Sequence, residues 1–522
     1  MKLQQFLRQR GLLDQEALMN KRILLSGSSD GIGELFVILL QLGVGKGKSG
    51  CIGVVVTERL PSSVFWKLMI ANNNSWKDLL KYFAKQGVSI ELVSKDEVDN
   101  NSWDIHLRIE GTKDVNGDLN GFVNGMRGLI STSNNFPIIH DSTLHPVHIS
   151  MRTIVAATMV HHSLKIMGVC KRIPVSDIWL TVTCRVETTD LQLARDHVRG
   201  LGGSLLDVTK SGDDLATIAR YRLPLEHNMD TYSLIEVENM ESEFSEDLDV
   251  GFIPWSAKFS DDENKTVMPS SDICILGVGG LGSWATPLLC QALPGGKIHI
   301  IDGDDEVAVH NLNRQVLYQN QDIGKAKAAV AKKRLSNAFP HLQFQAHQIY
   351  LTRTHISQPE EGGVDLDELF SNNKKEDDAD EKLRFALKNS DISLGCLDNM
   401  QARTILNEAS LKSSMPMING GGEAKHGIAE RLHDEGCMIC RYGNEAANAP
   451  EVISCTEEGM RPISSIVTTT AWVGAMMSAM TILELSDCKS HIGMRYSWLD
   501  GSIEAASVSK PPWFDEECIR HF

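Results

Sequence analysis

The 522-residue sequence lacks the features of several large classes of protein. It has no run of eighteen apolar residues free of charge, so we expect no membrane-spanning helix and no membrane partner. The segment from Met1 to Arg8 lacks the apolar stretch of a signal peptide, and we expect a cytoplasmic protein. Basic residues number 51 against 68 acidic ones, and the resulting net charge of −17 argues against general binding to nucleic acid.

The eleven cysteines are an odd number in a long chain, which argues against a disulfide framework. Metal binding, chemistry or burial must account for them. Much of the acidic charge lies in the segments 236–263 and 359–382. We interpret these as solvated linkers, with a docking surface for a basic partner as the alternative.

Two segments share one local pattern, about 250 residues apart, in which an apolar strand runs into a glycine turn and then a helix. They span Arg22 to Gly33 and Ile273 to Gly282. Each is typical of the opening of a βαβ unit, so the sequence predicts a duplicated α/β architecture. The intervening region predicts strands at 177–185 and 217–223 and a helix at 191–201. We therefore expect domains at 1–170 and 256–522, separated by a small α+β insert and acidic linker at 171–255.

Polar residues follow the second glycine loop in a particular order. Asp302 ends the next apolar strand, where an acidic side chain can accept hydrogen bonds from ribose hydroxyls. A dehydrogenase would share these features. Beyond them come Asn311-Leu312-Asn313-Arg314-Gln315, then Lys327, and finally Asp398-Asn399 after a later strand.

This series resembles the adenylating enzymes of the ubiquitin-activating family, which includes the thiamine and molybdopterin sulphur-carrier adenylyltransferases. That family has GxGGxG, D-x-D-x-V, N-L-x-R-Q, a lysine near the next helix start, and D-N after a later strand. All five elements occur here in order, although the second has one extra residue before its valine. The resemblance implies a Rossmann-like adenylation fold, present as a degenerate N-terminal copy and an active C-terminal copy that form a pseudo-dimer.

The resemblance also implies roles for individual residues. The ATP-binding set would be Gly277, Gly279, Gly280, Asp302, Asp304, Asn311, Arg314, Lys327, Asp398 and Asn399. Within it, Asp302 would hold the ribose, Arg314 and Lys327 would contact the phosphates with Asn311, and Asp398 would bind Mg²⁺. The chemistry agrees, because attack of a carboxylate on the α-phosphate needs cationic groups and a metal to stabilise charge. It needs no general base, since a carboxylate is already ionised at neutral pH.

Two cysteine-containing pairs near the end of the chain suggest a metal. Cys437 and Cys440 form C-x-x-C, and Cys518 and His521 form C-x-x-H. Two such pairs can converge on a tetrahedral structural zinc site. The resembled family often has a second C-x-x-C where His521 stands here. A redox-active or simply packed C-x-x-C is the alternative.

Two further residues are candidates for catalysis. Cys455 lies just before a long apolar helix, where the resembled family has a cysteine that forms a thioester or joins sulphur transfer. A helix N-terminus and the nearby Arg461 could lower its pKa. Arg8 matches an arginine that in this family reaches across a two-fold interface into the partner's ATP site, with Arg10 as second choice. A structural turn cysteine and an ordinary surface arginine are the alternatives.

Several functions compete. The first glycine loop also resembles that of short-chain dehydrogenases, but these need Tyr-x-x-x-Lys, and Tyr82 has its lysine at the third position after it. Within the adenylating class, our first choice is a ubiquitin-like protein activated at its C-terminal carboxylate, with a conjugating enzyme as a further partner. A sulphur-carrier protein and a ribosomal peptide precursor, as in microcin-type enzymes, follow. A non-catalytic scaffold is the fourth hypothesis. We expect a monomeric pseudo-dimer or a homodimer.

Overall fold

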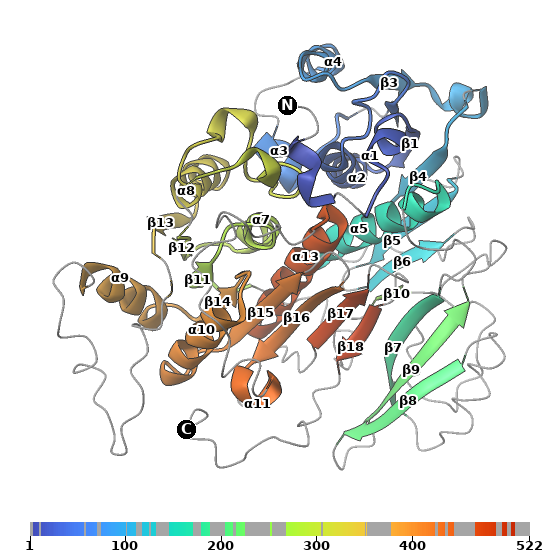
Figure 1. Cartoon of the computed structure of the whole chain (residues 1–522). Helices are drawn as coiled ribbons and strands as arrows, with labels where there is room; N and C mark the ends of the chain where they lie inside the picture. Colours follow the sequence, from blue (N-terminus) through green and yellow to red (C-terminus); the bar gives the residue numbers. More distant parts are fainter. Residues whose placement is uncertain are drawn as a thin grey trace, which may run out of the picture.

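The structure is a computed structural model, and it describes most of the chain (Figure 1). The described residues are 4–9, 12–56, 59–69, 75–100, 102–110, 117–124, 127–131, 146–170, 179–187, 204–211, 216–224, 251–252, 268–303, 306–349, 351, 377–422, 426–433, 437–442, 465–486, 493–497 and 503–506.

The first sheet has seven strands in the order β10-β6-β5-β4-β1-β2-β3. They are β1 (Arg22–Gly27), β2 (Cys51–Val55), β3 (Ile90–Val93), β4 (Ile105–Ile109), β5 (Leu119–Asn124), β6 (Arg127–Ser131) and β10 (Gly251–Phe252). The first five are parallel, whereas β6 runs antiparallel to β5 and β10 antiparallel to β6. β10 comes from the range expected to be insert. Runs such as Ile23-Leu24-Leu25 are apolar at every position because a parallel strand is buried on both faces.

The second sheet has eight strands in the order β13-β12-β11-β14-β15-β16-β17-β18. They are β11 (Ile273–Leu276), β12 (Lys297–Ile301), β13 (Gln343–His347), β14 (Ile392–Gly395), β15 (Met417–Gly422), β16 (His426–Leu432), β17 (Gly493–Ser497) and β18 (Ile503–Ala506). Again the first five are parallel and the rest antiparallel. The parallel α/β class expected from the sequence is confirmed.

A third, antiparallel sheet has the order β7-β9-β8. Its strands are β7 (Trp179–Glu187), β8 (Ser204–Ser211) and β9 (Ala216–Pro224). The sequence predicted β7 and β9 within two residues at each end, but it did not indicate β8. The predicted helix at 191–201 lies outside the described residues.

Helices cover and connect the sheets. The α-helices are α1 (Gln15–Met19), α2 (Ser29–Leu42), α3 (Val64–Met69), α4 (Trp76–Lys85), α5 (His148–Ile166), α7 (Gly282–Ala292), α8 (Lys327–Ala338), α9 (Asp377–Lys388), α10 (Met400–Lys412), α11 (Met438–Tyr442) and α13 (Val467–Leu485). The 3₁₀ helices are η1 (Gln4–Gln9), η2 (Lys95–Asn100), η5 (Val309–Asn311) and η6 (Asn320–Asp322). In the part of the chain that is described, none of them combines the length and hydrophobicity needed to cross a membrane.

The helices α5 and α13 lie between the two large sheets and pack against each other. α5 covers β5 and β6, and α13 covers β15 and β16. Both are buried along nearly their whole length and apolar on most sides, as expected for a helix enclosed by protein. Ser150 Oγ donates to Ser478 Oγ at 3.1 Å across this contact, and the rings of Phe65 and Trp284 lie 4.5 Å apart between α3 and α7. One continuous apolar core therefore includes both halves of the chain.

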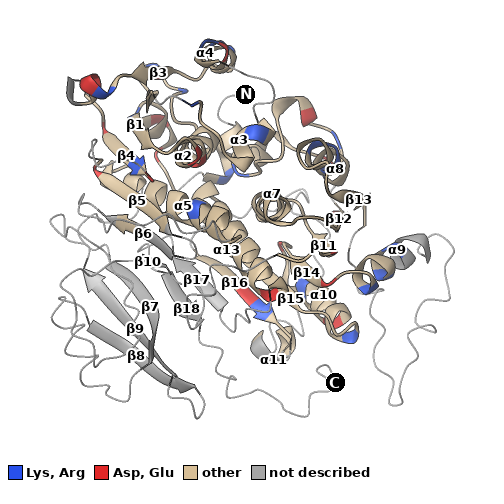
Figure 2. Ribbon diagram, turned by 180° about the vertical axis from the view of Figure 1, so that it is seen from behind, with Lys and Arg blue, Asp and Glu red and all other residues tan. Residues whose placement is uncertain are grey.

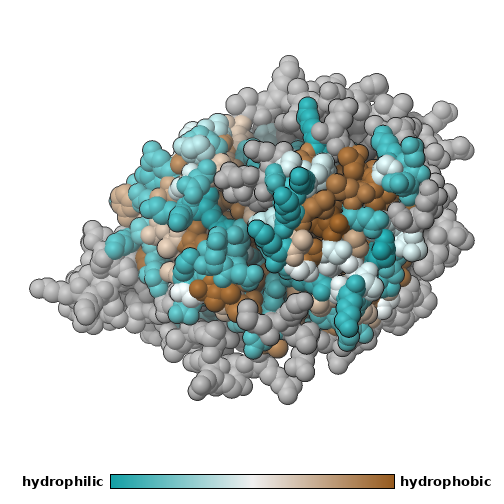
Figure 3. Space-filling view, turned by 90° about the horizontal axis from the view of Figure 1, so that it is seen from above, coloured by the Kyte–Doolittle hydropathy of each residue, from teal (hydrophilic) through white to brown (hydrophobic). Residues whose placement is uncertain are grey.

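Charged residues are common on the outer helices, although Glu34, Arg108 and Lys165 are buried. In Figure 2, α7 carries no charged residue. The outer helix α4 carries both basic and acidic residues, and the outer helix α8 carries basic residues alone. Figure 3 shows hydrophilic side chains interspersed with apolar ones on the upper face. The exposed large apolar residues among those described come from separate elements, and they are Leu7, Val56, Ile166, Ile323 and Phe385. Scattered exposed apolar residues of this kind are ordinary on a protein surface.

Gly474 allows α13 to approach the start of α7 closely. A Cβ at this position would lie 2.7 Å from both the Leu281 carbonyl oxygen and Trp284 Cβ. Such distances are too short for carbon, so one helix would have to move. Gly474 thus sets how closely α13 and α7 approach each other.

We predict that Gly474→Ala destabilises the protein by about 1–3 kcal/mol, because overpacking a core contact costs that much. Alanine alone would favour the helix by about 1 kcal/mol, so the sign of the change separates the two effects. Urea unfolding measures it. Gly422→Ala is the control, since its Cβ would make only ordinary contacts from 3.4 Å outward. A Gly474→Ala protein more stable than the native one would contradict the close approach.

Candidate functional site

The turn after β11 brings two strand ends together. Gly277 has a φ of +87°, a conformation that favours glycine, and a Cβ there would lie 2.5 Å from the Cys396 carbonyl oxygen. Its N–H donates to the Ile301 carbonyl at 2.7 Å, and Cys396 N–H donates to the Leu276 carbonyl at 2.9 Å. The loop is therefore held between the ends of β12 and β14.

This edge is a topological switch point. From β11 the chain builds β12 and β13 on one side, and it then returns to place β14 and β15 on the other. In open parallel sheets, ligands bind at the carboxyl ends of the strands where the strand order reverses in this way. The glycine loop and Asp398 both lie at that position.

The outer side of the glycine loop is open at Gly279 and more crowded at Gly280. A Cβ at Gly279 would meet only Gln315 Nε2, at 3.5 Å. One at Gly280 would lie 3.2 Å from Thr470 Cγ2 and 3.8 Å from Arg314 Nε. The first turn of α7 follows directly, and backbone N–H groups at a helix start are donors for an anion. The residue types and geometry thus fit a phosphate.

Asp302 is buried at the end of β12, and its Oδ2 accepts from Val278 N–H at 2.7 Å. Its bond to the loop therefore fixes the loop's shape. Tyr318 makes a second link, because its hydroxyl donates to the Val278 carbonyl at 2.9 Å and lies 3.4 Å from the Lys327 carbonyl. This tyrosine ties the glycine loop to the first residue of α8, a link that the sequence did not indicate.

Asn311, Arg314 and Lys327 are all buried, with 5%, 7% and 5% of their surface exposed. Arg314 Nη1 donates to the His310 carbonyl at 2.9 Å and to Asn313 Oδ1 at 3.1 Å. Arginine stays charged when buried, so its guanidinium is a cation beside the glycine loop. The structure brings this predicted set to one region.

Asp398 and Asn399 follow β14. Asp398 is exposed, whereas Asn399 caps α10 by accepting from Ala402 N–H at 2.7 Å. Arg403 donates through Nε and Nη2 to the Leu397 carbonyl at 3.0 and 2.7 Å. These bonds fix the peptide just before Asp398, which leaves its carboxylate accessible at the sheet edge.

Arg8 reaches this region from the start of the chain. It is buried in η1, which packs against η5, and its carbonyl accepts from Ser465 N–H at 2.9 Å. The segment that was predicted to lend an arginine therefore lies beside the Asn311–Arg314 loop.

Residues 256–511 match the ThiF family. The match covers most of the second half of the chain. The sulfur carrier protein ThiS adenylyltransferase of Escherichia coli (strain K12) is 28% identical over 175 residues, 33% of this chain and 58% of that protein. The ubiquitin-like modifier-activating enzyme 5 of Dictyostelium discoideum is 26% identical over 257 residues, 48% of this chain and 62% of that protein. The chain thus spans about three fifths of the length of these two relatives.

Two further proteins are similar to about half of the chain. The sulfur carrier protein adenylyltransferase of Thermus thermophilus is 26% identical over 261 residues, 48% of this chain and 83% of that protein. A crystal structure of E. coli MccB with ATP is 18% identical over 46% of this chain and 64% of that one, with a TM-score of 0.34. A similarity of that size does not identify a shared fold or substrate.

Some of the predicted site residues lie outside the described part of the chain, namely Asp304, Cys455, Cys518 and His521. The backbone of Cys440 lies in α11, and Cys437 just before it is buried. Among the described residues, no three His, Cys, Asp or Glu side chains gather as a metal site would require. Zinc therefore stays a prediction.

The buried residues Cys274, Cys290 and Cys396 are poor nucleophiles. Burial raises the pKa of Cys396 to about 12, and it raises the pKa values of Cys274 and Cys290 further. A thiol reacts as its thiolate, so these side chains serve packing.

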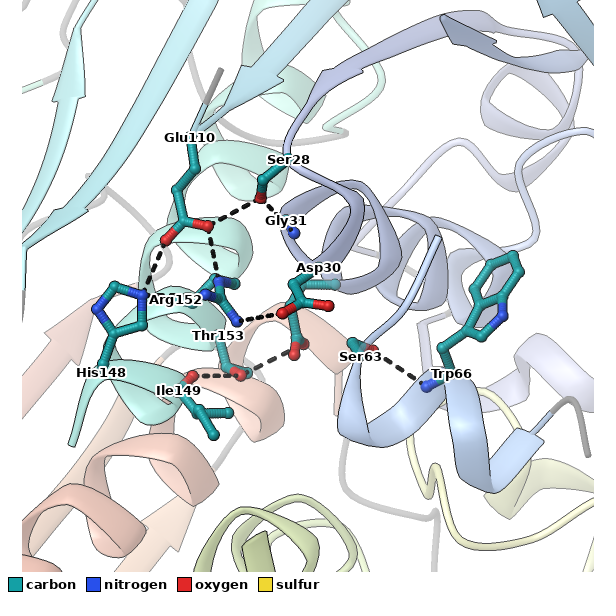
Figure 4. Close-up of polar contacts among 11 residues, drawn as sticks. Ser28, Asp30, Gly31, Ser63, Trp66, Glu110, His148, Ile149, Arg152 and Thr153 are labelled. Carbon is teal, nitrogen blue, oxygen red and sulfur yellow. Dashed lines mark hydrogen bonds and ion pairs between the residues drawn. The ribbon is translucent and has the colours of Figure 1, made fainter. Parts of the chain in front are cut away.

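The first sheet has a glycine turn similar to that of the second sheet, but different side chains surround it. Gly27 has a φ of +126°, and a Cβ there would overlap the Ile109 carbonyl at the end of β4. The next residue, Glu110, has a φ of +50°, which is unusual for a residue with a side chain. Its carboxylate accepts from Ser28 Oγ and from Arg152 Nε, each at 2.9 Å, and lies 3.2 Å from His148 Nε2 (Figure 4).

Glu110 thus occupies the start of α2 with a charge from the protein itself. Ser28 also caps this helix, accepting from Gly31 N–H at 3.0 Å. Burial acts to raise the pKa of Glu110, but the hydrogen bond from His148 and the charge of Arg152 outweigh it and hold the pKa below its usual range. An ionised carboxylate here repels a phosphate from the helix end.

A second carboxyl group in this cluster behaves in the opposite way. Burial raises the pKa of Glu34 on α2 to about 8, despite the lowering effects of Arg152 and Thr153. Thr153 Oγ1 lies 3.3 Å from Glu34 Oε2 and 3.2 Å from the Ile149 carbonyl. When the hydroxyl donates to Ile149, a protonated Glu34 can donate to the hydroxyl. Neutral Glu34 therefore suits this site.

We predict that Glu34→Gln makes stability less dependent on pH. The folded pKa of about 8 exceeds the ordinary value of 4.5, so the native protein loses stability as pH rises from about 4.5 through 8. Glutamine stays neutral, and the variant should gain on the native protein across this window by a few kcal/mol at most. Urea unfolding between pH 5 and pH 9 measures the difference.

Glu16→Gln, on the exposed surface of α1, is the matched control for this experiment. Its stability difference from the native protein should stay constant over the same range. A Glu34→Gln difference that is equally constant would mean that Glu34 is ionised at neutral pH.

Proposed function

We propose that the chain uses ATP to adenylate the C-terminal carboxylate of a partner protein. A carboxylate oxygen would form a bond to the α-phosphorus, the bond from that phosphorus to the β-phosphate would break, and pyrophosphate would leave. The observation that carries this proposal is the meeting of the glycine loop, Asp302, Arg314 and Asp398 at one switch point. The matching ThiF family segment and relatives named as adenylyltransferases support it.

Each part of the site would have a separate task. The Gly279–Gly280 turn and the start of α7 would donate backbone N–H groups to phosphate oxygens. Arg314, Lys327 and Asn311 would hold the phosphates as charge shifts to pyrophosphate. Asp398 would hold Mg²⁺, which would neutralise phosphate charge. The exposed carboxylate and the fixed peptide before it suit that role.

We also propose that residues 1–170 are a degenerate copy of the fold in 256–522, with 171–255 as insert and linker. Both large sheets have five parallel strands, then an antiparallel one, in the same spatial order. Gly27 and Gly277 make equivalent turns, and a 19-residue helix comes after β6 in the first sheet and, beyond α11, after β16 in the second. This supports a pseudo-dimer with one nucleotide site, since Glu110 fills the corresponding position in the first half. Arg8 would then reach ATP from the same chain.

A ubiquitin-like protein is the partner we propose, with a thioester to Cys455 after adenylation and transfer to a conjugating enzyme. Attack of the Cys455 thiolate on the adenylate carbonyl would release AMP. A sulphur-carrier protein is the second candidate, favoured by the named relatives from E. coli and T. thermophilus. Cys437, Cys440, Cys518 and His521 would hold a structural zinc ion, whose ligand types they match.

We expect ATP–pyrophosphate exchange that depends on the carboxylate partner. Arg314→Ala and Asp398→Ala should each lower it by about 10²–10³-fold, the usual loss when one charge-stabilising group is removed. Lys333→Ala, on the exposed face of α8, is the control and should leave the rate unchanged. Undiminished exchange in the first two variants would disprove the assigned site.

The thioester step has its own test. With a ubiquitin-like partner and ATP, gel electrophoresis should show an adduct that thiols cleave. Cys455→Ala should abolish the adduct but retain ATP–pyrophosphate exchange. Cys170→Ala is the control and should retain both the adduct and the exchange, because burial raises the pKa of the Cys170 thiol to about 12. An adduct that persists in Cys455→Ala would place the nucleophile elsewhere. Exchange without any adduct would favour a sulphur carrier.

A further inference from the structure

Side-chain amides join the first half of the chain to the candidate site. Asn313 Nδ2 donates to Gln9 Oε1 at 3.3 Å, Gln9 Nε2 donates to Gln15 Oε1 at 2.8 Å, and Gln15 Nε2 donates to the Leu42 carbonyl at 2.8 Å. At the other end, Asn313 Oδ1 accepts from Arg314 at 3.1 Å. We call Asn313, Gln9 and Gln15 the amide relay.

The relay has one direction throughout. Each of its amides donates toward Leu42 at the end of α2 and accepts from the side of Arg314. Turning any one amide over would place two donors or two acceptors against each other. Gln9 is 1% exposed and Asn313 0% exposed, so water cannot easily replace a lost partner. The orientation of one amide therefore sets that of the next.

The relay ends on the guanidinium beside the glycine loop. Arg314 Nη1 is held by Asn313 Oδ1 and the His310 carbonyl, while Arg314 Nε lies 3.8 Å from where a Cβ of Gly280 would be. An arginine that contacts phosphate works best when its rotamer is fixed before the ligand arrives. The partner that fixes Asn313 comes from 304 positions earlier in the chain.

We propose that Gln9 and Gln15 are positioning residues for Arg314, so that the first half of the chain sets the nucleotide affinity of the second. This inference rests on the phosphate-binding role proposed above for Arg314. It assigns to the first half a task separate from lending Arg8. A relay that merely glues the two halves together would be the competing explanation.

The test is binding of a non-hydrolysable ATP analogue by titration calorimetry, which needs no carboxylate partner. Gln9→Met keeps the length of the side chain but removes the amide, and it should weaken binding about tenfold, the value of one or two buried hydrogen bonds. Gln15→Met, which is less buried, should weaken it by a smaller factor. Gln5→Met is the matched control, because Gln5 is in the same η1 but accepts from Lys46.

The decisive arm repeats Gln9→Met in an Arg314→Ala background. If the relay acts through Arg314, the second substitution should add almost nothing to the loss of affinity. An equal further loss would mean that Gln9 acts by general stabilisation, and it would overturn the inference. Unchanged analogue binding by a folded Gln9→Met protein would also overturn the inference. If Gln9→Met does not fold, unchanged binding by Gln15→Met would overturn it instead.

The exchange assay keeps the two proposals apart. A native chain that binds the analogue through the relay, yet shows no exchange with any carboxylate partner, would refute the proposed function and leave the relay standing. If exchange depends on the partner but Gln9→Met leaves the affinity for the analogue unchanged, the relay is refuted and the proposed function stands.

Discussion

The close approach of Gly277 to the Cys396 carbonyl is the constraint on which the site depends. It brings the ends of β11 and β14 into contact where the strand order reverses, and any side chain larger than hydrogen would separate them. The glycine loop, Asp302 and the turn that carries Asp398 are close because of this contact. Asp302 then holds the loop from β12, and Tyr318 ties it to the helix that begins at Lys327. The site is thus built from strand ends and helix starts, which are more rigid than long loops.

The first sheet has the same order of parallel strands as the second, with a protein carboxylate beside its glycine turn. Gly27 makes an equivalent turn, but the residue after β4 is Glu110, held by Ser28, His148 and Arg152. A residue in an unusual backbone conformation persists only when its surroundings compensate, and here three side chains do so. In the second sheet, the residues after β14 lead to an exposed Asp398 instead. The two strand ends therefore suit opposite purposes, one closed by an internal ion pair and one accessible to a ligand.

Much of the second half could be predicted because its signals are local. Strand β11 is a continuous apolar run and the glycine loop follows it, while β12, β14 and α13 are mostly apolar. The strands β13, β16, β17 and β18 were not predicted, since their residues are mixed in character and lack such runs.

Contacts between distant residues left no local signal. The carboxylate of Glu110 meets Arg152 42 positions later, and Gln9 meets Asn313 304 positions later. Glu110 follows strand β4 and Gln9 lies in η1, so only the packing of distant parts of the chain brings each pair together. The polar groups that tune a site are therefore harder to predict than the groups that define it. For the same reason, a residue's role here cannot be inferred from its own half of the chain.

The shared core explains why the two halves act as one unit. α13 covers β15 and β16 with one side and packs on α5 with another, so it is apolar nearly all round. Without the first half, that second side would face water, at a cost proportional to the apolar area exposed. The same separation would remove Gln9 and Arg8 from beside the Asn311–Arg314 loop. Burial of α13 and the position of Gln9 and Arg8 beside the Asn311–Arg314 loop thus depend on one interface.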